Sequence, residues 1–96
     1  MKVRVRYSGS EVAKYFGSRE TKETFHLPPK AKYRQLLDVF EKKYQKVLEQ
    51  SDRRRRNDKM LDSFVFLSEG TPIRTKKGKP VNPEDEVFVG QMDFGG

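Results

Sequence analysis

The sequence predicts an α+β domain in which a mixed sheet of about four to five strands carries one main helix on one face. Short segments rich in β-branched and aromatic residues occur near both ends of the chain, at residues 2–7 and from residue 87, and again at residues 62–67. One long segment, residues 33–50, has the apolar period of a helix. A length of 96 residues leaves room for a single hydrophobic core, so we expect one domain.

The first strand is expected over residues 2–7. Apolar side chains occupy every second position and share one face, while the basic side chains Lys2, Arg4 and Arg6 share the other face. This alternation is typical of a strand that is buried on one side only. We expect this strand to lie in the centre of the sheet, paired with the last strand of the chain.

A second strand is expected over residues 20–27, which also alternate before Pro28 and Pro29 end the run. The connection between the two strands, residues 8–18, is bounded by glycines and contains four apolar residues. We expect this connection to form about one helical turn tucked under the sheet.

The clearest helix is expected over residues 33–50, because seven apolar side chains form one continuous stripe along it. Residues 31 and 32 offer no side-chain oxygen that could cap its first turn. The stripe has to face the sheet, and its members are Tyr33, Leu36, Leu37, Phe40, Tyr44, Val47 and Leu48.

The second half of the chain starts with a polar stretch, residues 51–59, which we interpret as a solvated loop. It contains Arg53, Arg54, Arg55 and Arg56, for which phosphate binding is the functional alternative. A third strand is expected over residues 62–67 and a short edge strand over residues 71–74.

One helix covers only one face of the sheet, so the other face is a candidate docking surface. If alternate residues of the last strand face the helix, Phe88 faces away from it, beside Arg4 and Arg6. The third strand would add either Phe64 with Phe66 or Val65 with Leu67. We assign Phe88, Arg4, Arg6 and Phe66 to this surface. The alternative is that residues 8–18 cover part of it.

The chain ends on Gly95 and Gly96, preceded by Asp93 and Phe94. We divide it into a domain at residues 1–90 and a flexible tail at residues 91–96. Two residues without Cβ can pass through a narrow channel, so such a tail can deliver the Gly96 carboxylate to a partner's buried site. The structural alternative is a frayed end or a linker remnant.

Several other kinds of chemistry are disfavoured. The chain has no cysteine, and its one histidine, His26, has no cysteine partner for a transition-metal site. The acidic residues at 84–86 lie in a turn and are expected to be solvated. Neither an apolar run long enough to span a membrane nor the pattern of a signal peptide is present, so we expect a cytoplasmic protein.

The order of elements resembles the ubiquitin-like β-grasp superfamily, and the ending is similar to that of its sulfur carriers and modifiers. These include the small subunit of molybdopterin synthase, the thiamine sulfur carrier, the ubiquitin-related modifier and the small archaeal modifier proteins. Residues 81–87, VNPEDEV, followed by a strand and the Gly95-Gly96 end, carry the resemblance. Residues 27–31, LPPKA, are similar to the entry of that family into its helix.

The resemblance implies that the chain is a carrier and not itself an enzyme. An E1-like enzyme would use Mg-ATP to adenylate the Gly96 carboxylate, so ATP and Mg would bind that partner and this chain would bind no cofactor or metal. The acyl group would then become a thiocarboxylate for a sulfur-accepting enzyme, or form an isopeptide bond with a lysine of a target protein. Gly95 would provide clearance, and Asp93 and Phe94 would lie on the approach.

Two alternatives stay open. The formal net charge of +7 permits a nucleic-acid-binding module, although arginines without interleaved aromatic residues are a weak signal and nucleic acid is disfavoured as a partner. The other alternative is a β-grasp interaction domain with an inert tail. We expect a monomer that does not bind membranes.

Overall fold

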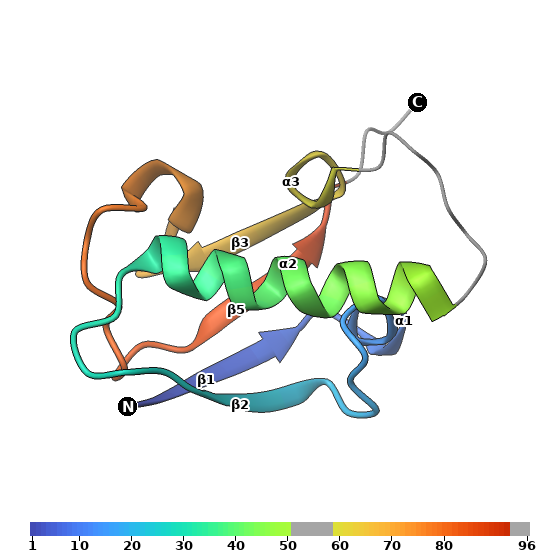
Figure 1. Ribbon diagram of the computed structural model, residues 1–96, viewed down its shortest axis with the longest axis horizontal. Coiled ribbons are helices and arrows are strands. Elements are labelled where there is room, and N and C mark those ends of the chain that lie inside the picture. The colour runs from blue at the N-terminus through green and yellow to red at the C-terminus, as the bar shows by residue number, and fades with distance from the viewer. Residues whose placement is uncertain (51–58, 93–96) are drawn as a thin grey trace.

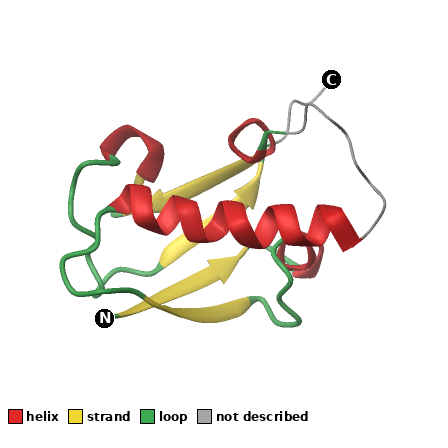
Figure 2. Cartoon of the chain, in the orientation of Figure 1, coloured by secondary structure: helices red, strands yellow, loops and turns green. Residues whose placement is uncertain are grey.

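The computed structural model describes residues 1–50 and 59–92. It contains a mixed five-stranded sheet with the strand order β2-β1-β5-β3-β4, and α2 crosses one face of that sheet (Figures 1 and 2). This arrangement is α+β, as predicted, and is compatible with a β-grasp fold. The elements are β1 (Lys2–Tyr7), α1 (Ser10–Tyr15), β2 (Lys22–His26), α2 (Tyr33–Gln50), α3 (Met60–Ser63), β3 (Phe64–Ser68), β4 (Thr71–Pro72), the 3₁₀-helix η1 (Ile73–Lys76) and β5 (Val87–Gln91).

The first and last strands form the centre of the sheet, which confirms their predicted pairing. They run parallel, with Val5 opposite Val87 and Tyr7 opposite Val89. β2 pairs antiparallel with the free edge of β1, and β3 pairs antiparallel with the free edge of β5. β5 pairs with β1 at residues 87–89 and with β3 at residues 88–91, so the middle of β5 has hydrogen-bonded neighbours on both sides.

The predicted helix has the bounds 33–50 in the structure, and its apolar stripe faces the sheet as expected. Five of the seven stripe residues are fully buried, whereas Val47 and Leu48 near the end of the helix are only partly buried. Among the described residues, no helix is long and apolar enough to cross a membrane.

The connection between β1 and β2 forms α1, which confirms the predicted helical turn. It packs on the same side of the sheet as α2, because Phe16, at the end of α1, lies inside an aromatic cluster. The ring centroid of Phe16 is 5.1 Å from that of Phe64 and 5.6 Å from that of Phe40. The alternative that residues 8–18 cover the other face of the sheet is therefore wrong.

Two short segments differ from the prediction. The strand expected from residue 62 starts at Phe64, because a turn of helix, α3, precedes it and buries Met60. The edge strand expected over residues 71–74 ends at Pro72 and continues as η1. Proline has no backbone N–H for a strand ladder, and the 3₁₀ turn that follows buries Ile73 completely.

The first turn of α2 is capped by a segment more than forty residues further along the chain. The backbone N–H of Tyr33 donates to the carbonyl of Lys79 at 3.0 Å, and that of Arg34 donates to the carbonyl of Lys77 at 3.1 Å. The Lys32 N–H donates to Gln35 Oε1 at 2.8 Å. These bonds replace the local cap that the sequence lacks.

Tyr7 carries a hydroxyl into the core and keeps it hydrogen-bonded. The hydroxyl donates to Glu23 Oε2 at 2.6 Å, and Glu23 Oε1 lies 2.8 Å from Lys43 Nζ. Burial raises the pKa of Tyr7 far above its usual range, and the hydrogen bond to the Glu23 carboxylate and its negative charge raise it further.

This shift predicts an alkaline loss of stability that depends on Tyr7. Above about pH 10 an unfolded chain releases the Tyr7 proton while the folded chain keeps it, so the free energy of unfolding falls by about 1.4 kcal/mol per pH unit from this residue. Urea unfolding of Tyr7→Phe at several pH values between neutrality and alkali is expected to show a shallower fall than the wild type. Parallel falls in the two proteins would contradict the assignment.

Candidate functional site

The sheet face opposite α2 presents a strip of three half-buried apolar side chains. Phe88 of β5 lies at the centre, and its neighbours in register are Arg6 of β1 and Leu67 of β3. Val65 of β3 lies opposite Gly90, one step further along the same face. We call Val65, Leu67 and Phe88 the apolar strip. In the described part of the chain, α1 and η1 contact α2, and α3 lines a hollow with it, so the helices lie on the other side of the sheet.

One residue assigned to this surface from the sequence belongs to the core. Phe66 is 2% exposed and its ring centroid lies 4.8 Å from that of Phe40 of α2. The register pairs Phe66 with the inward-facing Val89, so Val65 and Leu67 face outward in its place. The sequence left both choices open, because this strand is apolar at successive positions and period-2 alternation cannot orient it.

Arg4 and Arg6 lie on this face as predicted, and both are tied to the acidic turn that precedes β5. Arg6 Nε lies 3.3 Å from Glu86 Oε1, and its guanidinium carbon is 5.8 Å from the ring centroid of Phe88. Arg4 Nη2 donates to the Glu84 carbonyl at 2.7 Å. Arg6 is therefore held next to Phe88, and Arg4, two residues earlier on the same face of β1, extends the cationic border of the apolar strip.

Gly90 makes room for the ring of Phe88. A Cβ at Gly90 would lie 3.0 Å from Phe88 Cε1 and 3.6 Å from Val65 Cγ1, so the ring rests over the glycine backbone. This contact closes the gap between Phe88 and Val65. The apolar strip is thus continuous across two strands, and glycine at position 90 is what permits it.

The tail leaves the sheet from β5, beyond the apolar strip. Gln91 still pairs with Phe64, and the Met92 N–H donates to the Ser63 carbonyl at 2.9 Å. The anchored part of the chain therefore extends to residue 92, which corrects the predicted boundary after residue 90. Gly96, Gly95, Phe94 and Asp93 lie outside the described residues, as do the four arginines at 53–56.

The remaining candidate residues do not assemble into a reactive centre. His26 is exposed at the end of β2. Asp85 accepts a hydrogen bond from the Glu69 backbone N–H, and Glu86 pairs with Arg6, so two members of the acidic turn have structural contacts. Within residues 1–50 and 59–92, no three side chains among His, Asp and Glu lie close enough together to hold a metal ion.

The sheet face opposite α2 combines the apolar strip with two arginines at its border. An apolar centre with a charged border is the usual composition of a protein interface. Comparison with protein-family models, curated proteins and solved structures finds no match to this chain.

The opposite orientations of Phe66 and Phe88 predict very different costs of truncation. Phe66→Ala opens a cavity in the core and is expected to lower the free energy of unfolding by about 3–5 kcal/mol. Phe88→Ala removes a half-exposed ring and is expected to cost about 1 kcal/mol. Urea unfolding of both variants measures the difference, and similar losses would contradict the strand orientation described here.

Proposed function

We propose that this chain is a ubiquitin-like modifier or sulfur carrier whose Gly96 carboxylate is activated by an E1-like enzyme. The observation that carries the proposal is that β5, a central strand of the sheet, continues directly into the tail, with Met92 still bonded to Ser63. The chain itself would be the substrate and not the catalyst. ATP and Mg would bind the activating partner, and the expected compartment is the cytoplasm.

Because the base of the tail is anchored to the sheet, the length of the tail limits how far Gly96 can reach. Gln91 pairs with Phe64 and the Met92 N–H donates to the Ser63 carbonyl, so β3 and the residue before it hold the base of the tail. From Met92 to Gly96 an extended chain spans at most about 14 Å. A partner that docks on the sheet face would therefore need its reaction centre within this distance of the end of β5.

The proposed reaction starts from a carboxylate, which is a poor electrophile. Attack of the Gly96 carboxylate on the α-phosphorus of ATP forms the acyl adenylate and releases pyrophosphate. A sulfide equivalent, such as a persulfide on the partner with a thiol to reduce it, then displaces AMP and leaves a thiocarboxylate. A lysine amine that attacks the acyl carbon instead displaces AMP and leaves an isopeptide bond.

The apolar strip is the proposed contact with the activating enzyme. Val65, Leu67 and Phe88 would form the buried centre of the interface, and Arg4 and Arg6 would face carboxylates at its border. Border charges mainly affect the association rate, whereas a central aromatic side chain mainly affects the dissociation rate. Phe88 is therefore the residue of this surface on which binding should depend most.

Mass spectrometry of the protein from its own cells tests the proposal through a specific signature. Chymotrypsin cleaves after aromatic residues, so a cut after Phe94 would leave Gly95-Gly96 attached to the acceptor lysine. We expect either this remnant on target lysines or an intact chain that ends in a thiocarboxylate. The mass of the intact protein also establishes whether Gly96 is the C-terminal residue of the mature chain.

The matched control is a chain with one uncleaved residue added after Gly96, which should form neither product. Absence of both products from the native chain, when intact mass shows Gly96 as its end, would contradict the proposal. The ratio of remnant to thiocarboxylate separates conjugation from sulfur transfer.

A further inference from the structure

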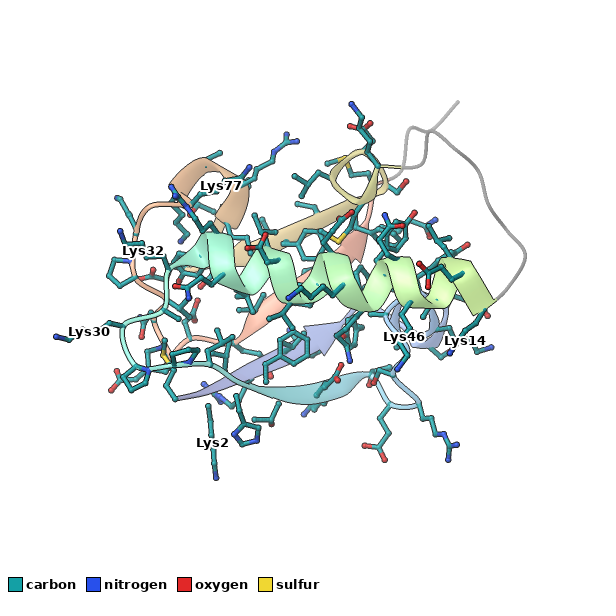
Figure 3. The ribbon with its side chains drawn as sticks, viewed as in Figure 1. Lys2, Lys14, Lys30, Lys32, Lys46 and Lys77 are labelled. Atoms are coloured by element: carbon teal, nitrogen blue, oxygen red, sulfur yellow. The ribbon has the colours of Figure 1, made fainter. Side chains whose placement is uncertain are left out.

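Two segments that are far apart in the sequence meet at the end of the molecule where α2 begins, one before and within the first turn of α2 and one around η1. They carry six exposed cationic side chains, of which Arg74 also lines a hollow beside Val65 and Met92. Figure 3 shows Lys30, Lys32 and Lys77 at this end, whereas Lys14 and Lys46 lie at the other. We call the six residues the basic end, and they are Lys30, Lys32, Arg34, Arg74, Lys77 and Lys79.

The two segments are joined by backbone hydrogen bonds, so the charges are held near one another. The N–H groups of Tyr33 and Arg34 donate to the carbonyls of Lys79 and Lys77. The Val81 N–H then donates to the carbonyl of Ala31 at 2.9 Å. A cluster built on fixed backbone loses little conformational freedom when a ligand binds, beyond that of the side chains themselves.

Carboxylates leave most of this charge uncompensated. In the described part of the chain, the ion pairs of the cationic side chains involve Arg6, Lys14, Lys43 and Lys76, and none of the six residues of the basic end. Lys76, although close in sequence, is largely buried, donates to the Ser68 carbonyl at 2.6 Å and lies over the Tyr33 ring. Arg34 and Lys77 share a hollow with Asp38 and Glu41, so these two carboxylates partly offset two of the six cations.

The chemistry of the basic end fits phosphates better than a protein surface. In these two segments Ala31, Ile73 and Val81 are buried and Pro80 is exposed, so no aromatic or large aliphatic side chain is exposed as an anchor for a protein partner. The six cations also have no exposed aromatic neighbour within these segments on which a base could stack. What remains are ammonium and guanidinium groups, which contact phosphate oxygens without reading sequence.

We propose that the basic end binds the phosphodiester backbone of a nucleic acid without sequence specificity. This inference goes beyond the proposed function and does not depend on the tail. The sequence disfavoured nucleic acid because the arginine run at 53–56 has no interleaved aromatic residues, whereas the fold brings together two other segments. β5 starts near the basic end and leads away from it, so a bound nucleic acid would leave the tail end of the sheet accessible.

The test compares two triple variants that each lower the formal net charge from +7 to +4. The first, Lys30→Gln with Lys32→Gln and Lys77→Gln, removes half of the basic end. The second, Lys2→Gln with Lys14→Gln and Lys46→Gln, removes the same charge from other surfaces. Fluorescence anisotropy with a labelled, mixed-sequence DNA duplex is measured over a salt series, and circular dichroism checks that both variants fold.

The wild type is expected to show log K falling with log salt at a slope of about −4 to −5, since each duplex phosphate contact contributes about −0.9. The first variant should lose about 2 to 3 units of that slope, and the second should keep it. Equal losses in both variants, or no binding at low salt, would overturn the proposal. Binding of phosphatidylserine vesicles or polyglutamate that matches the duplex in strength and in its sensitivity to the first variant would also overturn it.

Discussion

The parallel pairing of β1 with β5 is the constraint on which the rest of the structure depends. Two parallel neighbours cannot be joined by a tight turn, so the chain between them has to cross a face of the sheet and add its other strands at the edges. This pairing brings segments from near the two ends of the chain side by side in the core. It also makes the strand that leads into the tail one of the most firmly held in the sheet.

Packing around that central pair accounts for the difference between the two faces. Val87 and Val89 point toward α2 and are completely buried, which leaves Phe88 between them on the opposite face. On the inner side, Phe16 closes the core by contacting aromatic rings from α2 and β3. All of the large aromatic packing is therefore on one side of the sheet, and the outer face keeps a smaller apolar area that is available to a partner.

The sequence predicted those features that depend on local periodicity. Residues 33–50 repeat their apolar side chains every three to four positions, so both the helix and its buried face could be identified. β3 could not be oriented, because Phe64 to Leu67 are all apolar and only the register with β5 shows that Phe66 faces inward. Arg4, Arg6 and Phe88 were therefore correctly placed on the outer face of the sheet, whereas Phe66 was not.

Apart from the pairing of the first and last strands, features that depend on contacts between distant segments were not predicted. The cap of α2 uses carbonyls of residues 77 and 79, and the 3₁₀ turn after Pro72 is favoured by the burial of Ile73. The basic end arises from the same long-range contact, since its two halves are unremarkable as separate short segments. A single sequence reveals runs of charge, but a cluster assembled from two segments requires the fold.

In the roles proposed above, the apolar strip would contact a partner, the anchored base of the tail would position the reacting carboxylate and the basic end would bind phosphates. The central claim is that Gly96 is the group that becomes activated. Adenylation of Gly96 is measured most directly by the exchange of labelled pyrophosphate into ATP. The assay uses extract fractions from the cells that make this protein as the source of the activating enzyme. We predict exchange that increases when the native chain is added and does not increase when the added chain carries one extra residue after Gly96. Exchange that responds equally to both chains, or to neither, would contradict the account.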